Sequence, residues 1–331
     1  MGMRSGSVLR IVAFAVISMT PMCLAAEDGW TRKTDMPTAR FGVTTSVVDG
    51  RIYAIGGGVR VGDMVRNVQE YNPATDSWLE KANMPTATCW HSTSAVDGKI
   101  YAIGGWAPGG VGIDTVVEYD PATDTWRERA EMPTPRHFLS TSAVNGKIYA
   151  IGGLSSGIAG LATVEEYDPI SNTWTTKADM PTARMLMSTS AVNGIIYAIG
   201  GARLVHTELS DVQAYDPATD TWTTKAPMPT ARVFFSTSVV NGKIYAMGGC
   251  KGNYDVLTSN SVEVFDPVTN TWTVTDDLPT PRAALTTSAV NRRIYAIGGD
   301  PRANWNQPSS IVEELTVGLP PPRRAGRRVT P

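Results

Sequence analysis

Short runs of alternating apolar and polar residues follow one another along most of the chain and recur at a steady spacing. A representative unit reads STSAV, KIYAIGG, VEEYDP and TWTTK, with turn residues between the runs. Runs of this length bounded by Gly, Pro, Asn and Asp are typical of β-strands. Asn-Gly or Asp-Gly between the first two runs suits a tight hairpin, and DPATDT between the last two suits a turn started by Pro. The pattern predicts four strands per unit, joined as antiparallel hairpins.

This unit occurs six times. A Trp marks the fourth strand of each unit, at a spacing of 48 residues and once of 50: Trp30, Trp78, Trp126, Trp174, Trp222 and Trp272. A Gly pair ends the second strand at the same step: Gly56-Gly57, Gly104-Gly105, Gly152-Gly153, Gly200-Gly201, Gly248-Gly249 and Gly298-Gly299. Six units built only of strands predict a closed ring of sheets rather than a helical solenoid.

The pattern MPTAR…VNGKIYAIGG…VEEYDPATDTW resembles the kelch repeat, with Gly-Gly, Tyr and Trp at matching offsets, over about residues 29–316. The resemblance implies an all-β, six-bladed kelch propeller, spanning residues 27–318, with four antiparallel strands per blade. The chain enters on a fourth strand at 29–36 and ends on a third strand, IVEELTV. The N-terminal strand is therefore expected to complete the last blade and close the ring.

The two ends of the chain differ from the repeats. Residues 1–26 run from basic through apolar to small residues, which is typical of a cleaved signal peptide, so we expect a secreted or periplasmic protein. The apolar run is shorter than the roughly 20 residues of a spanning helix, although an uncleaved anchor remains the alternative. Residues 319–331 are rich in Pro and Arg and are expected to be disordered.

Composition and charge narrow the possible partners. With 42% hydrophobic and 18% charged residues, the 331-residue chain is an ordinary globular protein. Removing the two arginines of the N-terminal segment and the four of the tail from the net charge of −2 leaves −8 for the body. An acidic body argues against nucleic-acid binding.

The loops of such a ring divide between two faces. One face collects VNGK hairpins and DPATDT turns, which are nearly identical in every unit; the other collects the MPTAR links and the stretches after each Gly pair, which all differ. We call the second the variable face and expect function there, because loops on a rigid scaffold commonly bind ligands. The three Trp outside the blade positions map to it: Trp90, Trp106 and Trp305. The nearby Phe41, Phe138, Phe234 and Phe235 either join them or plug the channel mouth.

Five of the six MPTAR links carry Arg at the fifth position: Arg40, Arg136, Arg184, Arg232 and Arg282. Guanidinium groups that converge on a channel are suited to carboxylates or phosphates. The resemblance to kelch domains that bind acidic peptides implies ligand contact by these arginines. The alternative is that each pairs with a blade carboxylate, such as Glu165, Glu263 or Glu313.

The second link departs from the others and reads MPTATCWH, with Thr88 in place of Arg, followed by Cys89, Trp90 and His91. Cys89, His91 and His137 are weak candidates for zinc or copper, with His206 further along. Their spacing matches no established metal motif, so we expect no metal and no cofactor. His91 and His137, with Trp90, Trp106, Trp305 and the five arginines, instead form the predicted ligand-binding set. Outside the signal, Cys89 and Cys250 lie in distant repeats and predict no disulfide.

Three functions compete. The leading prediction is a recognition module, monomeric, that binds a protein or glycan, acidic ones included, through the variable face. The second is a sugar mutarotase, because the chain is similar in length, leader and blade number to bacterial kelch mutarotases of sialic acid; Asp114, Glu208 and Asp255 are then candidate acids. The third is a structural spacer. The sequence contains no H-E-x-x-H or Walker motif, so a binding role is favoured over an enzyme.

Overall fold

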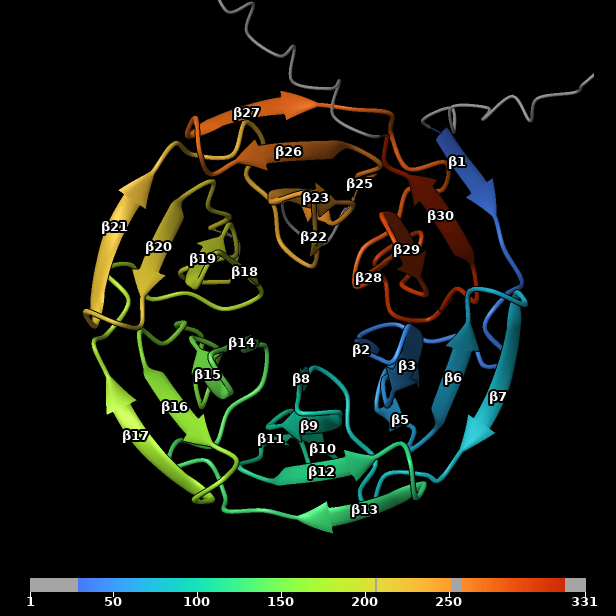
Figure 1. Cartoon of the computed structure of the whole chain (residues 1–331), viewed down its shortest axis with the longest axis horizontal. Coiled ribbons are helices and arrows are strands. Elements are labelled where there is room, and N and C mark those ends of the chain that lie inside the picture. The colour runs from blue at the N-terminus through green and yellow to red at the C-terminus, as the bar shows by residue number, and fades with distance from the viewer. Residues whose placement is uncertain (1–28, 206, 252–256, 319–331) are drawn as a thin grey trace, which may run out of the picture.

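The computed structural model describes residues 29–205, 207–251 and 257–318. Over these residues, six four-stranded antiparallel sheets stand around a central channel, and no helix occurs (Figure 1). The predicted all-β propeller of six four-stranded blades is thus confirmed. Within the same residues no helix is long and apolar enough to cross a membrane. The predicted signal peptide and tail lie outside the described residues and stay predictions.

Each blade runs from its innermost strand at the channel to its outermost strand at the rim. Blade 1 comprises β2 (Thr44–Val48), β3 (Arg51–Ile55), β6 (Val68–Asn72) and β7 (Ser77–Lys81). Blade 2 comprises β8 (Ser92–Val96), β9 (Lys99–Ile103), β12 (Val116–Asp120) and β13 (Thr125–Glu128). Blade 3 comprises β14 (Ser140–Val144), β15 (Lys147–Ile151), β16 (Val164–Asp168) and β17 (Thr173–Lys177).

The second half of the ring repeats this order. Blade 4 comprises β18 (Ser188–Val192), β19 (Ile195–Ile199), β20 (Val212–Asp216) and β21 (Thr221–Lys225). Blade 5 comprises β22 (Ser236–Val240), β23 (Lys243–Met247), β26 (Val262–Asp266) and β27 (Thr271–Val274). Blade 6 comprises β28 (Thr286–Val290), β29 (Arg293–Ile297), β30 (Val312–Thr316) and β1 (Gly29–Arg32).

Among the described residues, three small hairpins project from the variable face, each in the stretch after a Gly pair. They are β4 (Gly58–Arg60) with β5 (Asp63–Met64), β10 (Trp106–Ala107) with β11 (Val111–Gly112), and β24 (Cys250–Lys251) with β25 (Leu257–Thr258). The divergent loop sequences therefore form local structures that differ from blade to blade.

The core lies between neighbouring blades. At the junction of blades 1 and 2, for example, Tyr53 and Ile55 pack with Ile100 and Tyr119. The Trp of each outer strand reaches back to the preceding blade, as Trp126 does when its Nε1 donates to a main-chain carbonyl 2.8 Å away. An indole buries a large apolar surface and keeps one polar atom for such a bond, so the repeated Trp belongs to the scaffold.

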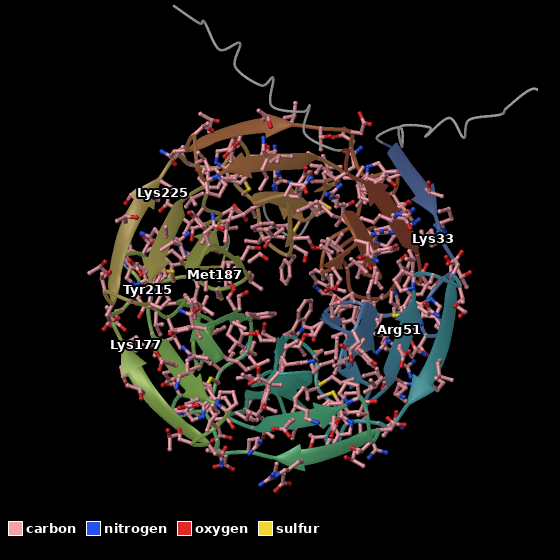
Figure 2. All side chains as sticks on the ribbon, in the orientation of Figure 1. Lys33, Arg51, Lys177, Met187, Tyr215 and Lys225 are labelled. Carbon is pink, nitrogen blue, oxygen red and sulfur yellow. The ribbon has the colours of Figure 1, made fainter. Side chains whose placement is uncertain are left out.

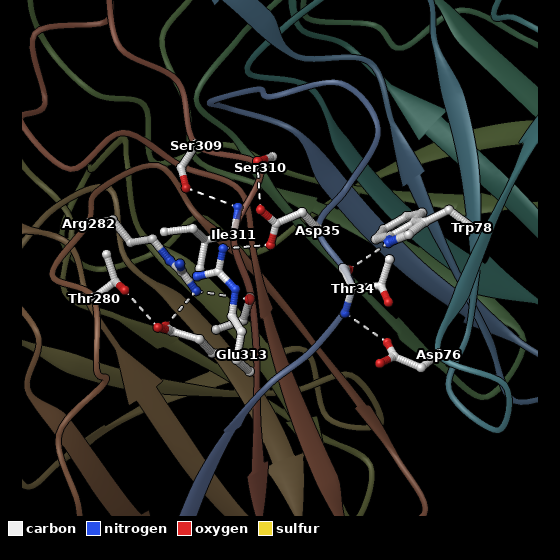
Figure 3. Close-up of polar contacts among 12 residues, drawn as sticks. Thr34, Asp35, Asp76, Trp78, Thr280, Arg282, Ser309, Ser310, Ile311 and Glu313 are labelled. Carbon is white, nitrogen blue, oxygen red and sulfur yellow. Dashed lines mark hydrogen bonds and ion pairs between the residues drawn. The ribbon is translucent and has the colours of Figure 1, made fainter.

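The N-terminal strand closes the ring, as predicted. β1 pairs antiparallel with β30, and Gly29 lies opposite Thr316. The segment after β1 then crosses to blade 1, where the Thr34 amide donates to Asp76 (2.9 Å) and its carbonyl accepts from Trp78 Nε1 (3.0 Å; Figure 3). This crossing ties the last blade to the first.

Candidate functional site

One residue just before each innermost strand adopts a left-handed backbone conformation, with φ between 51° and 58°: Gly42, Trp90, Phe138, Leu186, Phe234 and Ala284. Their main chains bond to one another around the channel. The amides of Phe138 and Leu186 donate to the carbonyls of Trp90 and Phe138, both at 3.0 Å, and three similar bonds continue the circle through Gly42 and Ala284 to Phe234. We call these six residues the mouth ring. Bulky residues rarely take positive φ, and such strained positions cluster at functional sites.

The mouth ring directs aromatic side chains over the channel. Phe41, Trp90, Phe138, Phe234 and Trp305 form an aromatic cluster whose neighbouring ring centroids lie 4.8–5.8 Å apart. Trp90 of blade 2 reaches Phe234 of blade 5, on the opposite side of the ring, at 5.3 Å. The expected grouping of Trp90 and Trp305 on the variable face is therefore seen, and most of the Phe side chains join them. Phe235 instead packs in the core between blades.

Beneath the aromatic cluster lies a cavity of about 200 Å³, lined by Ser and Thr of the innermost strands. Side chains from every blade converge on this centre in Figure 2, where Met187 of blade 4 is labelled beside it. At five blade junctions a Ser hydroxyl bonds the Thr of the next blade, as Ser94 does with Thr141 at 2.8 Å. At the junction of blades 1 and 2, the hydroxyls of Ser46 and Thr93 are buried without a partner among the described residues.

The structure contradicts ligand contact by the arginines. All five side chains are fully buried, with no surface toward the channel or the variable face: Arg40, Arg136, Arg184, Arg232 and Arg282. Arg136, for example, donates to the carbonyls of Gly152 (3.1 Å) and Thr163 (3.0 Å) and to the Glu165 carboxylate (2.8 Å). Figure 3 shows the equivalent pairing of Arg282 with Glu313, at 3.1 Å. The arginines clamp the strands of their own blades, which is the alternative raised from the sequence.

In blade 2 both partners of this interaction, the arginine and its third-strand residue, are replaced together. The third-strand partner of each arginine is Gln69, Glu165, Gln213, Glu263 or Glu313. In blade 2, where Thr88 replaces Arg, the corresponding residue is Val117, so no unpaired acid is left. A cavity of about 10 Å³ remains between Thr88, Val117 and Gly104, enough for about one water molecule. The link MPTATCWH is therefore not a decayed repeat, because Thr88 and Val117 together replace the arginine and its polar partner.

His91 belongs to the same exchange. It is buried where the other blades place an apolar residue such as Leu139, and its ring nitrogens lie 2.9 Å from Thr44 Oγ1 and 3.1 Å from Thr88 Oγ1. Burial, assisted by the charge of Arg40, lowers the pKa of His91 to about 4, so the ring is neutral at physiological pH. The structure thus contradicts ligand contact by His91 and makes it a packed, hydrogen-bonded part of the blade junction.

This burial predicts a pH-dependent stability. Between an unfolded-state pKa near 6.5 and the native value of about 4, only the unfolded chain takes up the proton, so the native state loses up to about 3 kcal/mol as the pH falls through this window. His91→Leu, which copies Leu139 of blade 3, should reduce the loss of unfolding free energy over this pH window. Urea unfolding at pH 7 and pH 4.5 measures it; an unchanged difference between the two pH values in the variant would refute a neutral, buried His91.

A metal centre is not formed by the predicted candidates. The described residues contain no group of three His, Cys, Asp or Glu placed to hold an ion. Cys89 and Cys250 are both free and buried, and burial raises the pKa of the Cys89 thiol to about 12. His206 and Asp255 lie outside the described residues.

Trp106 and His137, in contrast, come together. Their ring centroids are 5.3 Å apart, and His137 lies 4.5 Å from Phe138, so the two residues extend the aromatic cluster from the channel mouth toward the β10–β11 hairpin. Sequence reasoning placed both on the variable face, yet it missed Leu186, Gly42 and Ala284 as members of the mouth ring. All six members of the mouth ring lie two residues after the fifth position of the MPTAR link, and this shared position could have identified them from the sequence.

Comparisons with known proteins agree with this architecture. Residues 25–255 match the family model described as the Attractin/LZTR1 beta-propeller, and residues 232–279 match the Kelch motif. Among solved structures, one titled "Structure of YjhT" superposes with a TM-score of 0.74 at 16% identity, covering 86% of this chain and 97% of that one, a likeness that shows the fold alone. No curated protein matches at the threshold applied. Because the first family model spans more than half of the sequence, the chain belongs to the Attractin/LZTR1 beta-propeller family and is built of kelch repeats.

Proposed function

We propose that this propeller is a recognition module that binds a protein or glycan through its variable face. The observation that carries the proposal is the aromatic cluster held across the channel by the strained mouth ring. Trp90, Phe138, Phe234 and Trp305 are only partly buried, so their rings form both the lid of the channel and part of the surface. Aromatic side chains of this kind are enriched where proteins bind partners, because they bury much area with few torsions to fix.

The two faces differ in what they offer a partner. We call the face with the VNGK hairpins and DPATDT turns the repeated face. Its turns satisfy their own polar groups, as when Asp120 Oδ1 accepts from the Ala122 amide at 3.0 Å. The variable face exposes side chains of both signs around the aromatic cluster, including Arg60, Asp63 and Arg203. A mixed polar rim around an apolar centre suits a specific interface.

The mutarotase alternative receives no support from the site. In that alternative the five arginines of the links hold the acidic sugar, and all five are fully buried. The proposed module acts as a monomer outside the cytoplasm, a placement that rests on the order of residues in segment 1–26.

A matched pair of variants tests the proposal. Thermal shift against neutral glycans, acidic sugars and acidic peptides first identifies a binder; at a hundred times its dissociation constant it adds about 2.7 kcal/mol, visible as a few degrees. Trp305→Ser in the aromatic cluster should weaken that binding at least about tenfold, the size of effect typical of an aromatic anchor. Val268→Ser on the repeated face, where the side chain is 85% exposed, serves as the control. Equal weakening by both variants, or by neither, would contradict the proposal.

A further inference from the structure

Two buried polar atoms beside the aromatic cluster have no hydrogen-bond partner in the described residues. One is Trp106 Nε1, and the other is His137 Nδ1 on a side chain that is only 8% exposed. The two rings are tilted by 31° at a centroid distance of 5.3 Å, so the unsatisfied atoms belong to stacked neighbours. Leaving a buried polar atom unpaired costs about 1–3 kcal/mol, so two together call for an explanation.

A glycine-rich segment covers these atoms. The turn of the β10–β11 hairpin contains Gly109 and Gly110 at positive φ, and Gly112 follows in β11. A Cβ on Gly110 would lie 3.8 Å from Trp106 Nε1, and one on Gly112 would lie 3.1 Å from His137 Nδ1. Residues 108–112 therefore form a glycine flap that lies directly over the unsatisfied pair.

The flap is a thin cover. Residues 108–111 are exposed, and within the turn the Gly110 amide bonds the Ala107 carbonyl at 3.3 Å. Segments with few buried apolar contacts and exposed main-chain bonds open at low free-energy cost. Lifting the flap would break its pairing with Trp106 and Ala107 of β10 and would expose the indole N–H and the imidazole nitrogen.

The chemistry of the pair selects its ligand. An indole N–H only donates, whereas the neutral imidazole offers Nδ1 as an acceptor when its proton sits on Nε2. Burial lowers the pKa of His137 to about 4, and the adjoining Cys89 is also uncharged. An anion could use only the indole, and an ammonium only the imidazole. A hydroxyl group accepts from the first and donates to the second.

We infer that Trp106 and His137 form a subsite for a neutral pyranose beneath the glycine flap. A pyranose combines hydroxyl groups with an apolar C–H face, and the rings of Trp106, His137 and Phe138 supply the matching aromatic surface. The inference rests on the proposed function, since it names the ligand class for one part of the variable face.

The NMR signal of the Trp106 indole N–H can report binding at the subsite directly. In ¹H–¹⁵N spectra of the labelled full-length protein, the Trp106 indole signal is assigned by its absence in Trp106→Phe. Titration with the methyl α-pyranosides of glucose, galactose and mannose should move this signal saturably for at least one of them. Trp106→Phe keeps the ring but not the donor, and His137→Phe removes the acceptor; each should weaken binding of that glycoside at least about tenfold.

The outcomes separate the subsite from the broader function. An indole signal that none of the three glycosides moves, or that only sialic acid moves, would overturn the subsite and leave a trapped water as the partner of the two atoms. A macromolecule whose binding is lost in Trp305→Ser but kept in Trp106→Phe would likewise overturn the subsite while sustaining recognition through the variable face. Glycoside binding that survives Trp305→Ser and disappears in Trp106→Phe supports the subsite.

Discussion

Replacing Arg136 with leucine is expected to lower the free energy of unfolding by about 3–5 kcal/mol, because it leaves the Glu165 carboxylate without its ion-pair partner in the blade interior. Arg136 is fully buried, and its guanidinium also satisfies main-chain carbonyls of Ala150, Gly152 and Thr163. Burial lowers the pKa of Arg136 to about 10 despite the nearby Glu165, so the group remains charged at neutral pH. Urea denaturation monitored by tryptophan fluorescence measures the loss.

The protein supplies its own control for this experiment. Arg136→Thr combined with Glu165→Val copies Thr88 and Val117 of blade 2 into blade 3. This double variant should lose less than half of what Arg136→Leu loses, because it removes both charges together and leaves a void rather than an unpaired ion. A double variant as unstable as the single one would show that the ion pair is not what makes the arginine indispensable.

Trp90→Ala is expected to cost about 3 kcal/mol, at the lower end for a large aromatic residue because Trp90 is only partly buried. The substitution removes four ring contacts across the channel, to Phe41, Phe138, Phe234 and Trp305. Trp90→Gly should be less destabilised than Trp90→Ala by about 0.5–1 kcal/mol, since glycine adopts the positive φ of 57° without strain. Thermal or urea unfolding of the two variants gives the order.

Gly42 provides a test of the same packing. A Cβ on Gly42 would lie 2.8 Å from the Trp90 ring, so Gly42→Ala should be markedly destabilising in the native protein. In the Trp90→Gly background the clash is gone, and the remaining cost should fall to about 1 kcal/mol for positive φ alone. Equal costs in both backgrounds would contradict close packing of Trp90 on Gly42.

The fold followed from the sequence because each of its determinants is local and repeated. Alternating runs, Asn-Gly or Asp-Gly turns and a periodic Trp specify the blade, and the missing strands at the two ends specify the closure. The aromatic residues of the variable face were also predictable, since all three Trp outside the blade positions fall in its loops. Trp305 and Trp90 meet at 5.5 Å although they belong to blades far apart in sequence.

The arginines could not be placed in this way. Side chains two residues apart share a face only where the backbone is extended. The mouth-ring residue, with its positive φ, lies between each arginine and the strand that follows. This turn directs Arg136 into the blade while Phe138 faces the channel. The pairing itself was readable in principle, because the link without Arg is also the unit with Val117 where the others carry Gln or Glu. Polar atoms without partners, such as Trp106 Nε1, leave no mark in a sequence.

The pairing of β1 with β30 also fixes when the molecule can finish folding. Gly29 leaves the ribosome among the first residues of the structured part, and its partner Thr316 among the last. Contacts across so long a stretch of chain form slowly, because the intervening loop must lose much of its freedom first. Until synthesis reaches β30, the sixth blade has no place to receive β1, and the ring stays open at one seam. Ring closure is therefore a late step that follows the synthesis of β30.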